Sequence, residues 1–146
     1  LESSDSNARS IVDVLTAEGR RLAMVQESVP EVRKGDKRVL LLDGELLGAI
    51  NRVPRADDVR SNIHVGGVVE PIDVTPKERA ILAAMAPRLR ADGLVFVGLD
   101  FIGERLTEVN VTSPTGIQEL SRHVGRDVSA DVMAFVERKV ADLAKG

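Results

Sequence analysis

The first third of the chain contains three segments with a pattern of apolar positions, each short enough to be one helix, one strand or one hairpin. Residues 8–18 carry apolar side chains at helical spacing, and Gly19 stands where a left-handed residue would end that helix. Residues 22–26 have the pattern of a short strand. The apolar runs within residues 38–53 are joined by Asp43-Gly44, the dipeptide most typical of a two-residue hairpin turn.

The remainder of the chain predicts a loop, a hairpin and three helices. Residues 55–70 are polar and glycine-bearing with no sustained period, which favours a mobile loop that could act as a lid. Thr75-Pro76-Lys77-Glu78 is a capping box that opens a helix ending near Gly93. Two strands, residues 94–102 and 106–111, and two more helices, one opened by Ser113-Pro114 and one capped by Ser129, complete the pattern. These elements predict an α+β fold with helices packed on an antiparallel sheet.

Composition narrows the class of protein. Of 146 residues, 20 are basic and 23 acidic, so the chain lacks the basic excess that binding to a nucleic acid backbone needs. It has no cysteine, and no apolar run approaches the roughly 20 residues that span a bilayer. We expect a single cytoplasmic domain whose partners are neither nucleic acids nor membranes.

The hairpin formed by the last two predicted strands carries the candidate chemistry. If residues 103–105 form a three-residue turn, Ile102 lies opposite Leu106, Asp100 lies opposite Glu108, and Asn110 shares their face. Two carboxylates directly opposite one another repel unless a cation or a shared proton intervenes. Three oxygen-bearing side chains suit magnesium and leave room for waters or phosphate oxygens. The alternative is a solvated hairpin whose charges simply face water.

The stretch GLDFIGERLTEVNVTSPTG, with GDKRVLLLDGE and RSNIHVGG upstream, resembles the prokaryotic glutathione synthetase family of ATP-grasp ligases. The resemblance extends from about residue 8 to 136. It implies that residues 1–146 are the C-terminal part of an ATP-grasp domain, and that ATP and Mg²⁺, with Mn²⁺ as a possible substitute, are the cofactors. The family's preceding half, with a substrate domain and two ATP-binding lysines, has no counterpart in this chain.

The resemblance also assigns roles to individual residues. It implies that Asp100, Glu108 and Asn110 bind the metal, with Asn110 also near the nucleotide, and that Arg38, Arg52 and Arg60 stabilise phosphate and substrate carboxylate. The implied adenine hinge consists of Val25, Gln26, Glu27, Ser28 and Val29. The implied substrate contacts are Arg38, Thr112, Ser113, Thr115, Gly66 and Gly67. His64 and His123 have no partner at metal-ligand spacing and are not expected to be catalytic bases.

The implied reaction joins γ-glutamylcysteine to glycine through an acyl phosphate, in a complete parent protein that could be a homo-oligomer. Val68 departs from the polar residue that is common after the two glycines of the loop, which weakens the expected role of the lid in stabilising charge. The alternatives are another ATP-grasp peptide ligase, or a non-catalytic nucleotide-binding or association module. By itself the chain is expected to be inactive.

Overall fold

The computed structural model describes residues 4–54 and 68–145. Its elements in chain order are α1 (Ala8–Leu15), the 3-10 helix η1 (Pro30–Lys34), β1 (Asp36–Leu42), β2 (Glu45–Val53), β3 (Val68–Pro71), α2 (Pro76–Ala91), β4 (Phe96–Ile102), β5 (Arg105–Asn110), α3 (Ile117–Val124) and α4 (Ser129–Leu143). None of the described helices is long and apolar enough to cross a membrane.

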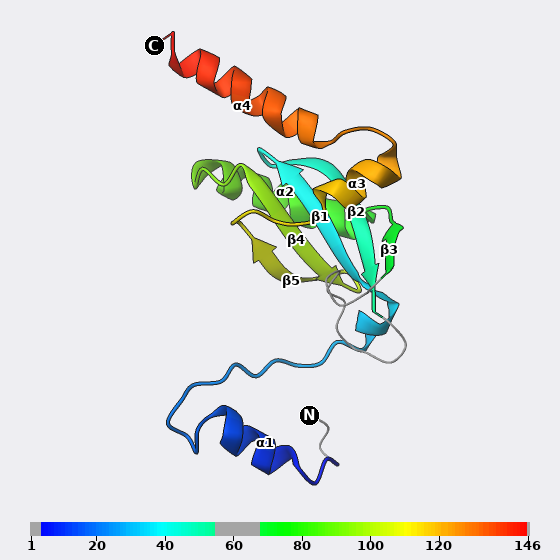
Figure 1. Cartoon of the computed structure of the whole chain (residues 1–146), viewed down its shortest axis with the longest axis vertical. Coiled ribbons are helices and arrows are strands. Elements are labelled where there is room, and N and C mark those ends of the chain that lie inside the picture. The colour runs from blue at the N-terminus through cyan, green and yellow to red at the C-terminus, as the bar shows by residue number, and fades with distance from the viewer. Residues whose placement is uncertain (1–3, 55–67, 146) are drawn as a thin grey trace.

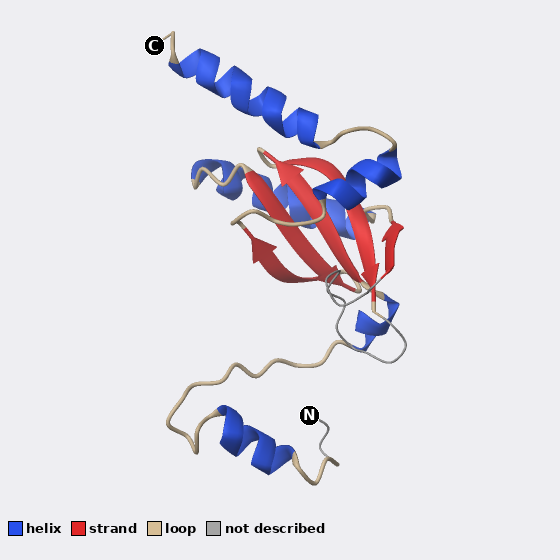
Figure 2. Cartoon of the chain, in the orientation of Figure 1, coloured by secondary structure: helices blue, strands red, loops and turns tan. Residues whose placement is uncertain are grey.

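The strands form one sheet in the order β3-β2-β1-β4-β5, with every neighbouring pair antiparallel. Helix α2 lies behind this sheet in the view of Figures 1 and 2, and α3 lies across its front. The α+β class with an antiparallel sheet and packed helices is therefore confirmed. Strands β1 and β4 lie next to each other at the centre, so their side chains are the most enclosed.

Alternation along the strands divides the core into two clusters, one on each face of the sheet. The larger cluster, on the α2 side, contains Val39, Leu41, Ala49, Val74, Leu82, Leu89, Val97, Leu99 and Phe101. The smaller one, on the α3 side, contains Leu40, Ile50, Leu120 and Val128. Because successive strand residues point to opposite faces, Arg38 lies on the α3 side and Lys37 on the α2 side.

Two local predictions are confirmed by backbone geometry. Asp43 and Gly44 both have positive φ, 52° and 78°, as the two central residues of a type I′ hairpin turn require. At the start of α2 the Thr75 hydroxyl accepts from the Glu78 amide at 3.2 Å, and the Glu78 carboxylate accepts from the Thr75 amide at 2.8 Å. Both signals are local in sequence, which is why no tertiary information was needed to find them.

Two predictions are wrong. Residues 22–26 are not a strand: they run in an extended segment with no partner strand in the described structure, and Leu22 and Met24 are 104% and 83% exposed. An apolar run becomes a strand only where a neighbour accepts its backbone hydrogen bonds. Residues 68–70 belong to β3, which pairs with β2, so the loop prediction for 55–70 is wrong at these three residues. Residues 55–67 lie outside the described part.

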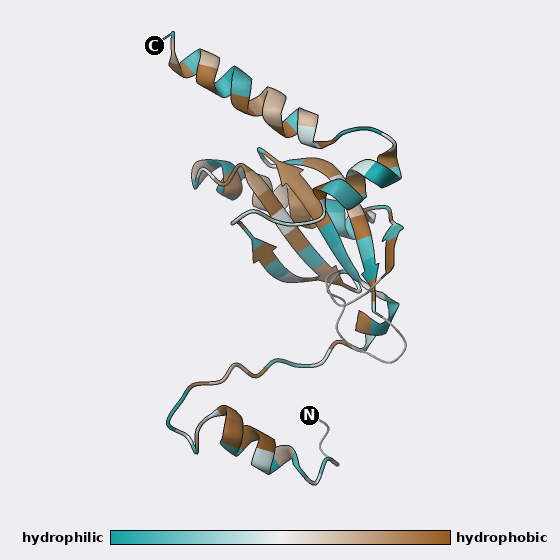
Figure 3. Ribbon diagram, in the orientation of Figure 1, coloured by the Kyte–Doolittle hydropathy of each residue, from teal (hydrophilic) through white to brown (hydrophobic). Residues whose placement is uncertain are grey.

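Apolar side chains remain exposed at both ends of the chain. Helix α1 lies apart from the sheet in Figure 1, and Figure 3 shows hydrophobic positions along α1 and α4. Val14 and Leu15 of α1 are 79% and 60% exposed, and Val140 and Leu143 of α4 are 60% and 81% exposed. The well-packed part of the molecule is therefore the sheet with α2 and α3, and this part carries the site.

A buried ion pair joins α2 to the sheet. Lys37 Nζ donates to Glu78 Oε2 at 2.7 Å and to the Asp73 carbonyl at 2.9 Å, and both side chains are more than nine-tenths buried. Glu78 is also the capping-box residue, so one carboxylate both starts the helix and holds it against β1. Removing one partner of such a pair leaves an uncompensated buried charge.

We expect Glu78→Gln to lower the free energy of unfolding by about 3 kcal/mol, because glutamine keeps the cap but leaves the Lys37 charge unpaired. Urea unfolding of the chain measures this change. The double variant Lys37→Met/Glu78→Gln should regain most of the loss. A double variant that is no more stable than Glu78→Gln alone would show that the buried charge is not the cause.

Candidate functional site

The β4–β5 hairpin brings the three predicted metal-binding residues to one face of the sheet. Asp100 lies opposite Glu108 and Gly98 lies opposite Asn110, as the sequence predicted. The turn is nevertheless shorter than expected, because Ile102 pairs with Arg105 rather than Leu106. The register shifts by one residue between Asp100 and Phe101, and this β-bulge supplies the residue that the turn lacks.

Asp100 is the centre of a buried network of charges. Arg38 on β1 lies directly opposite Asp100 on β4. Its guanidinium binds the carboxylate in a bidentate manner, with Nε donating to Oδ1 at 2.5 Å and Nη2 to Oδ2 at 2.7 Å. Arg52 Nη2 lies 3.0 Å from Asp100 Oδ2 and donates to Asp36 Oδ2 at 2.6 Å. Asn110 Nδ2 donates to Asp100 Oδ2 at 3.2 Å. Two arginines thus share two aspartates.

The network shifts the pKa of two of its members. Burial alone would raise the pKa of Asp100, but the hydrogen bonds from Arg38 and the charges of Arg52 and Arg38 outweigh burial and hold that pKa below its usual value. Burial would likewise lower the pKa of Arg52, yet the charges of Asp100 and Asp36 raise it. Both groups are therefore charged at neutral pH. The Nε–H of Arg52 is buried and has no hydrogen-bond partner among the residues that the structure describes.

The segment after β5 returns to Arg38. Arg38 Nη1 donates to the Thr115 carbonyl at 3.1 Å and to its hydroxyl at 3.4 Å. Thr115 therefore lies beside the charged cluster, which consists of Asp36, Arg38, Arg52, Asp100, Glu108 and Asn110. Thr112 and Ser113 are exposed on the approach to it. Helix α3 begins at Ile117, later than the Ser113-Pro114 signal suggested, because Ser113 takes a left-handed backbone conformation with φ 47°.

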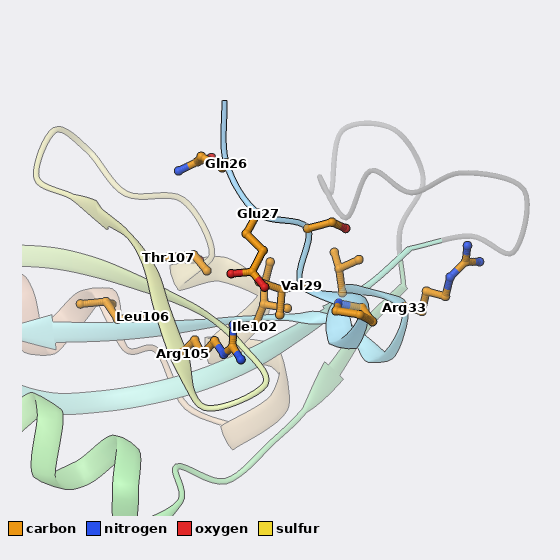
Figure 4. A pocket seen from close by; sticks show the side chains of 11 residues that line it. Gln26, Glu27, Val29, Arg33, Ile102, Arg105, Leu106 and Thr107 are labelled. Carbon is orange, nitrogen blue, oxygen red and sulfur yellow. The ribbon is translucent and has the colours of Figure 1, made fainter. Parts of the chain in front are cut away.

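Beside this cluster lies a groove of about 840 Å³ between the extended segment before η1 and the β4–β5 hairpin. Figure 4 shows Gln26 and Glu27 on one side, and Ile102, Leu106 and Thr107 on the other. The lining is Gln26, Glu27, Ser28, Val29, Pro30, Val32, Arg33, Ile102, Arg105, Leu106 and Thr107. The groove is linked to the cluster through β5, in which the groove residue Thr107 immediately precedes Glu108.

The groove contains four of the five predicted hinge residues, Gln26 to Val29. Val25 does not line it and is 92% exposed. The sequence did not single out the opposite wall, Ile102, Leu106 and Thr107, or Asp36 in the charge network. For Asp36 a signal existed, because it begins β1 opposite Arg52. Arg60, His64, Gly66 and Gly67 lie outside the described residues.

The donor set of the cluster suits a hard cation. Asp100 and Glu108 are carboxylates, and because Asn110 donates through Nδ2, its amide oxygen is left as a third oxygen beside them. Within the described ranges, no three histidine, cysteine, aspartate or glutamate side chains gather at one point, so the amide would be the third oxygen ligand. Asp100 is the most heavily used, since its oxygens already face two arginines and the Asn110 amide.

The sequence comparisons with known proteins agree on one family. The family model described as the ATP-grasp domain of prokaryotic glutathione synthetase matches residues 1–125. The glutathione synthetase of Synechococcus elongatus is 50% identical over 140 residues, which are 96% of this chain and 43% of that protein. The glutathione synthetase of Bradyrhizobium diazoefficiens is 48% identical over 137 residues, 94% of this chain and 44% of that protein.

A likeness among solved structures concerns the fold alone. The D-alanine–D-alanine ligase of Bacillus anthracis, solved as a complex with ATP, superposes with a TM-score of 0.55 at 14% sequence identity and covers 97% of this chain and 50% of the ligase. The chain therefore spans less than half of the curated relatives named above, and half of this structural neighbour.

Gly98 has no side chain, and the space above its Cα is taken up by Arg38 and Pro114. A larger residue at position 98 should therefore destabilise the protein. A Cβ at residue 98 would lie 2.7 Å from Pro114 Cβ and 3.1 Å from Arg38 Cδ. We expect Gly98→Ala to lower the free energy of unfolding by about 1–3 kcal/mol in urea titrations, because it overpacks the cluster. Pro114→Gly should relieve the nearer overlap, so that the double variant loses less than the sum of the single variants. Strictly additive losses would contradict the overlap.

Proposed function

Since this chain belongs to the prokaryotic glutathione synthetase family of ATP-grasp domains, we propose that it is the C-terminal part of an ATP-dependent ligase that joins γ-glutamylcysteine to glycine. One observation carries the proposal. The groove and the charged cluster meet at consecutive residues, Thr107 and Glu108, so one ligand can occupy both. A nucleotide would match both parts, with its flat base in the groove and its negatively charged phosphates beside the arginines.

In this proposal the base of ATP lies in the groove and its phosphates point toward the cluster. Gln26 to Val29 form one wall, and backbone groups of this extended segment are available to the base edge. The apolar side chains of Ile102 and Leu106 face them from the hairpin. Because the chain has no tyrosine or tryptophan, aliphatic side chains take the place of an aromatic platform for the base.

Glu108, Asn110 and Asp100 would hold Mg²⁺, whose positive charge would offset the negative charge of the phosphates when it is bound. Glu108 is exposed, whereas Asp100 is only 3% exposed and is bound by arginine. A carboxylate accepts roughly four hydrogen bonds, and Asp100 already faces about that many donors. Glu108 is therefore the principal ligand, and Asp100 would contribute by exchanging one donor.

The arginines would bind two anions, the phosphate of ATP and the carboxylate of the substrate. Guanidinium stays charged at any working pH and meets two oxygens at once. Arg38 and Arg52 lie on the same face as Glu108, and within the described residues the buried Nε–H of Arg52 has no acceptor of its own. We assign them to the phosphate and the substrate carboxylate. The resemblance also implies roles for Arg60, Gly66 and Gly67, which lie outside the described residues. Thr112, Ser113 and Thr115 would contact the substrate.

Two other functions remain as alternatives. Another ATP-grasp peptide ligase would use the same groove and cluster with a different amine acceptor, and a panel of amino acids and dipeptides assayed on the longer protein separates it from the first proposal. A non-catalytic nucleotide-binding module would bind ATP but release no ADP with any acceptor. The charged cluster favours a catalyst, because a binding module does not need two buried arginines beside the phosphates.

The metal assignment is tested by Glu108→Gln in a protein that also carries the upstream half of an ATP-grasp domain. The substitution keeps shape but removes the charge that attracts the cation, so ADP formation should fall by about 100-fold and demand more Mg²⁺. Glu104→Gln is the matched control, since Glu104 is an exposed carboxylate on the turn of the same hairpin. An unchanged Mg²⁺ titration for Glu108→Gln would return this residue to a solvated surface charge.

A further expectation concerns the chain by itself. Phosphoryl transfer depends on donors that surround the phosphates, and the described residues of this chain supply them from one sheet. The purified 146-residue chain should therefore show no glycine-dependent release of ADP from ATP above the level of an Arg38→Met variant. Turnover that depends on both glycine and Arg38 would contradict this expectation.

A further inference from the structure

The β-bulge in the β4–β5 hairpin determines which side chains reach the cluster. Near the turn, Ile102 pairs with Arg105 and Phe101 with Leu106. Continued without a bulge, this pairing would set Leu99 opposite Glu108 and Val97 opposite Asn110. Glu108 and Asn110 would then face the α2 side, away from Asp100, because a slip of one residue turns every side chain to the other face. The observed shift restores both to the face of Asp100.

The apolar pattern of β5 does little to enforce this choice. β5 is an edge strand, Leu106 is half-buried, and Val109 is 41% exposed. Glu108 on the opposite face would therefore still meet water, so the slipped register lacks the large penalty that a buried carboxylate would impose. Register is weakly specified where neither face of a strand is well buried. A specific contact must select the bulged form.

Thr107 supplies such a contact. It is the residue of β5 that has no partner in the pairing, and its hydroxyl donates to the Asp100 carbonyl at 3.0 Å. The bond ties the extra residue to the position on β4 where the register shifts. On the other side of the bulge from the turn, the hydrogen bond from Asn110 to Asp100 also holds β5 in the shifted register.

We propose that Thr107 is a positioning residue, whose hydroxyl fixes the bulged register and thereby brings Glu108 and Asn110 to Asp100. Its importance for catalysis rests on the proposed function, but the register itself does not. The inference separates Thr107 from an ordinary exposed strand residue, for which valine would be an equal or better replacement, since valine matches its shape and strongly favours strands.

The test compares Thr107→Val with Thr107→Ser in the 146-residue chain, without metal or nucleotide, by nuclear magnetic resonance. In the native chain and in Thr107→Ser, backbone protons of residue 108 should show cross-strand contacts to residue 100. In Thr107→Val these contacts should be lost or halved, and contacts from residue 108 to residue 99 should appear. Unchanged signals from Leu82 and Leu89 of α2 verify that the core is intact.

A Thr107→Val chain that keeps the native contacts of residue 108 in full overturns the inference. So does a Thr107→Ser chain that slips as far as the valine variant, because the hydroxyl would then not be the cause. Neither outcome depends on ATP or Mg²⁺. A failure of the metal assignment appears separately, as a Glu108→Gln variant with normal Mg²⁺ dependence, so the two proposals can fail independently.

Discussion

The ion pair between Arg38 and Asp100 is the contact on which the rest of the site depends. The two residues lie opposite each other on the central strands β1 and β4, where both side chains are more than nine-tenths buried. A buried carboxylate and a buried guanidinium are each costly without the other. The two parallel hydrogen bonds between them fix the orientation of both side chains. Arg52, Asn110 and Thr115 each contact one member of this pair.

Arg52 and Asp36 extend the pair toward β2, and Asn110 extends it toward β5. The charges alternate, so the network is close to neutral despite its burial. On the opposite face of β1, Lys37 is held by Glu78 in the same way. Consecutive residues of one strand are thus anchored to the two layers of the molecule, which prevents β1 from sliding or rotating beneath the site. Stability and site geometry depend on the same strand.

Sequence predicted the parts of the fold that local chemistry decides. The Asp43-Gly44 turn and the capping box at Thr75 need only neighbouring residues, and both are confirmed. Residues 22–26 were mistaken for a strand, because apolar character alone does not supply a neighbouring chain to pair with. In the hairpin, Asp100 was correctly placed opposite Glu108 but for the wrong reason. A three-residue turn and a two-residue turn with a bulge give the same pairing beyond the bulge, and periodicity cannot distinguish them.

The bulge also explains which site residues the sequence did not reveal. A regular strand shows one face every second residue, so Thr107 and Glu108 should point to opposite sides. The bulge breaks this alternation, so that Thr107 lines the groove and Glu108 lies opposite Asp100. It also leaves the two carboxylates in different environments. Asp100 is buried and faces four donors, which suits it to hold the arginines in place, whereas Glu108 is exposed at the edge of the sheet. In the proposed function, Glu108 would therefore be the principal ligand that binds and releases the cation, and Asp100 would mainly fix the arginines beside it.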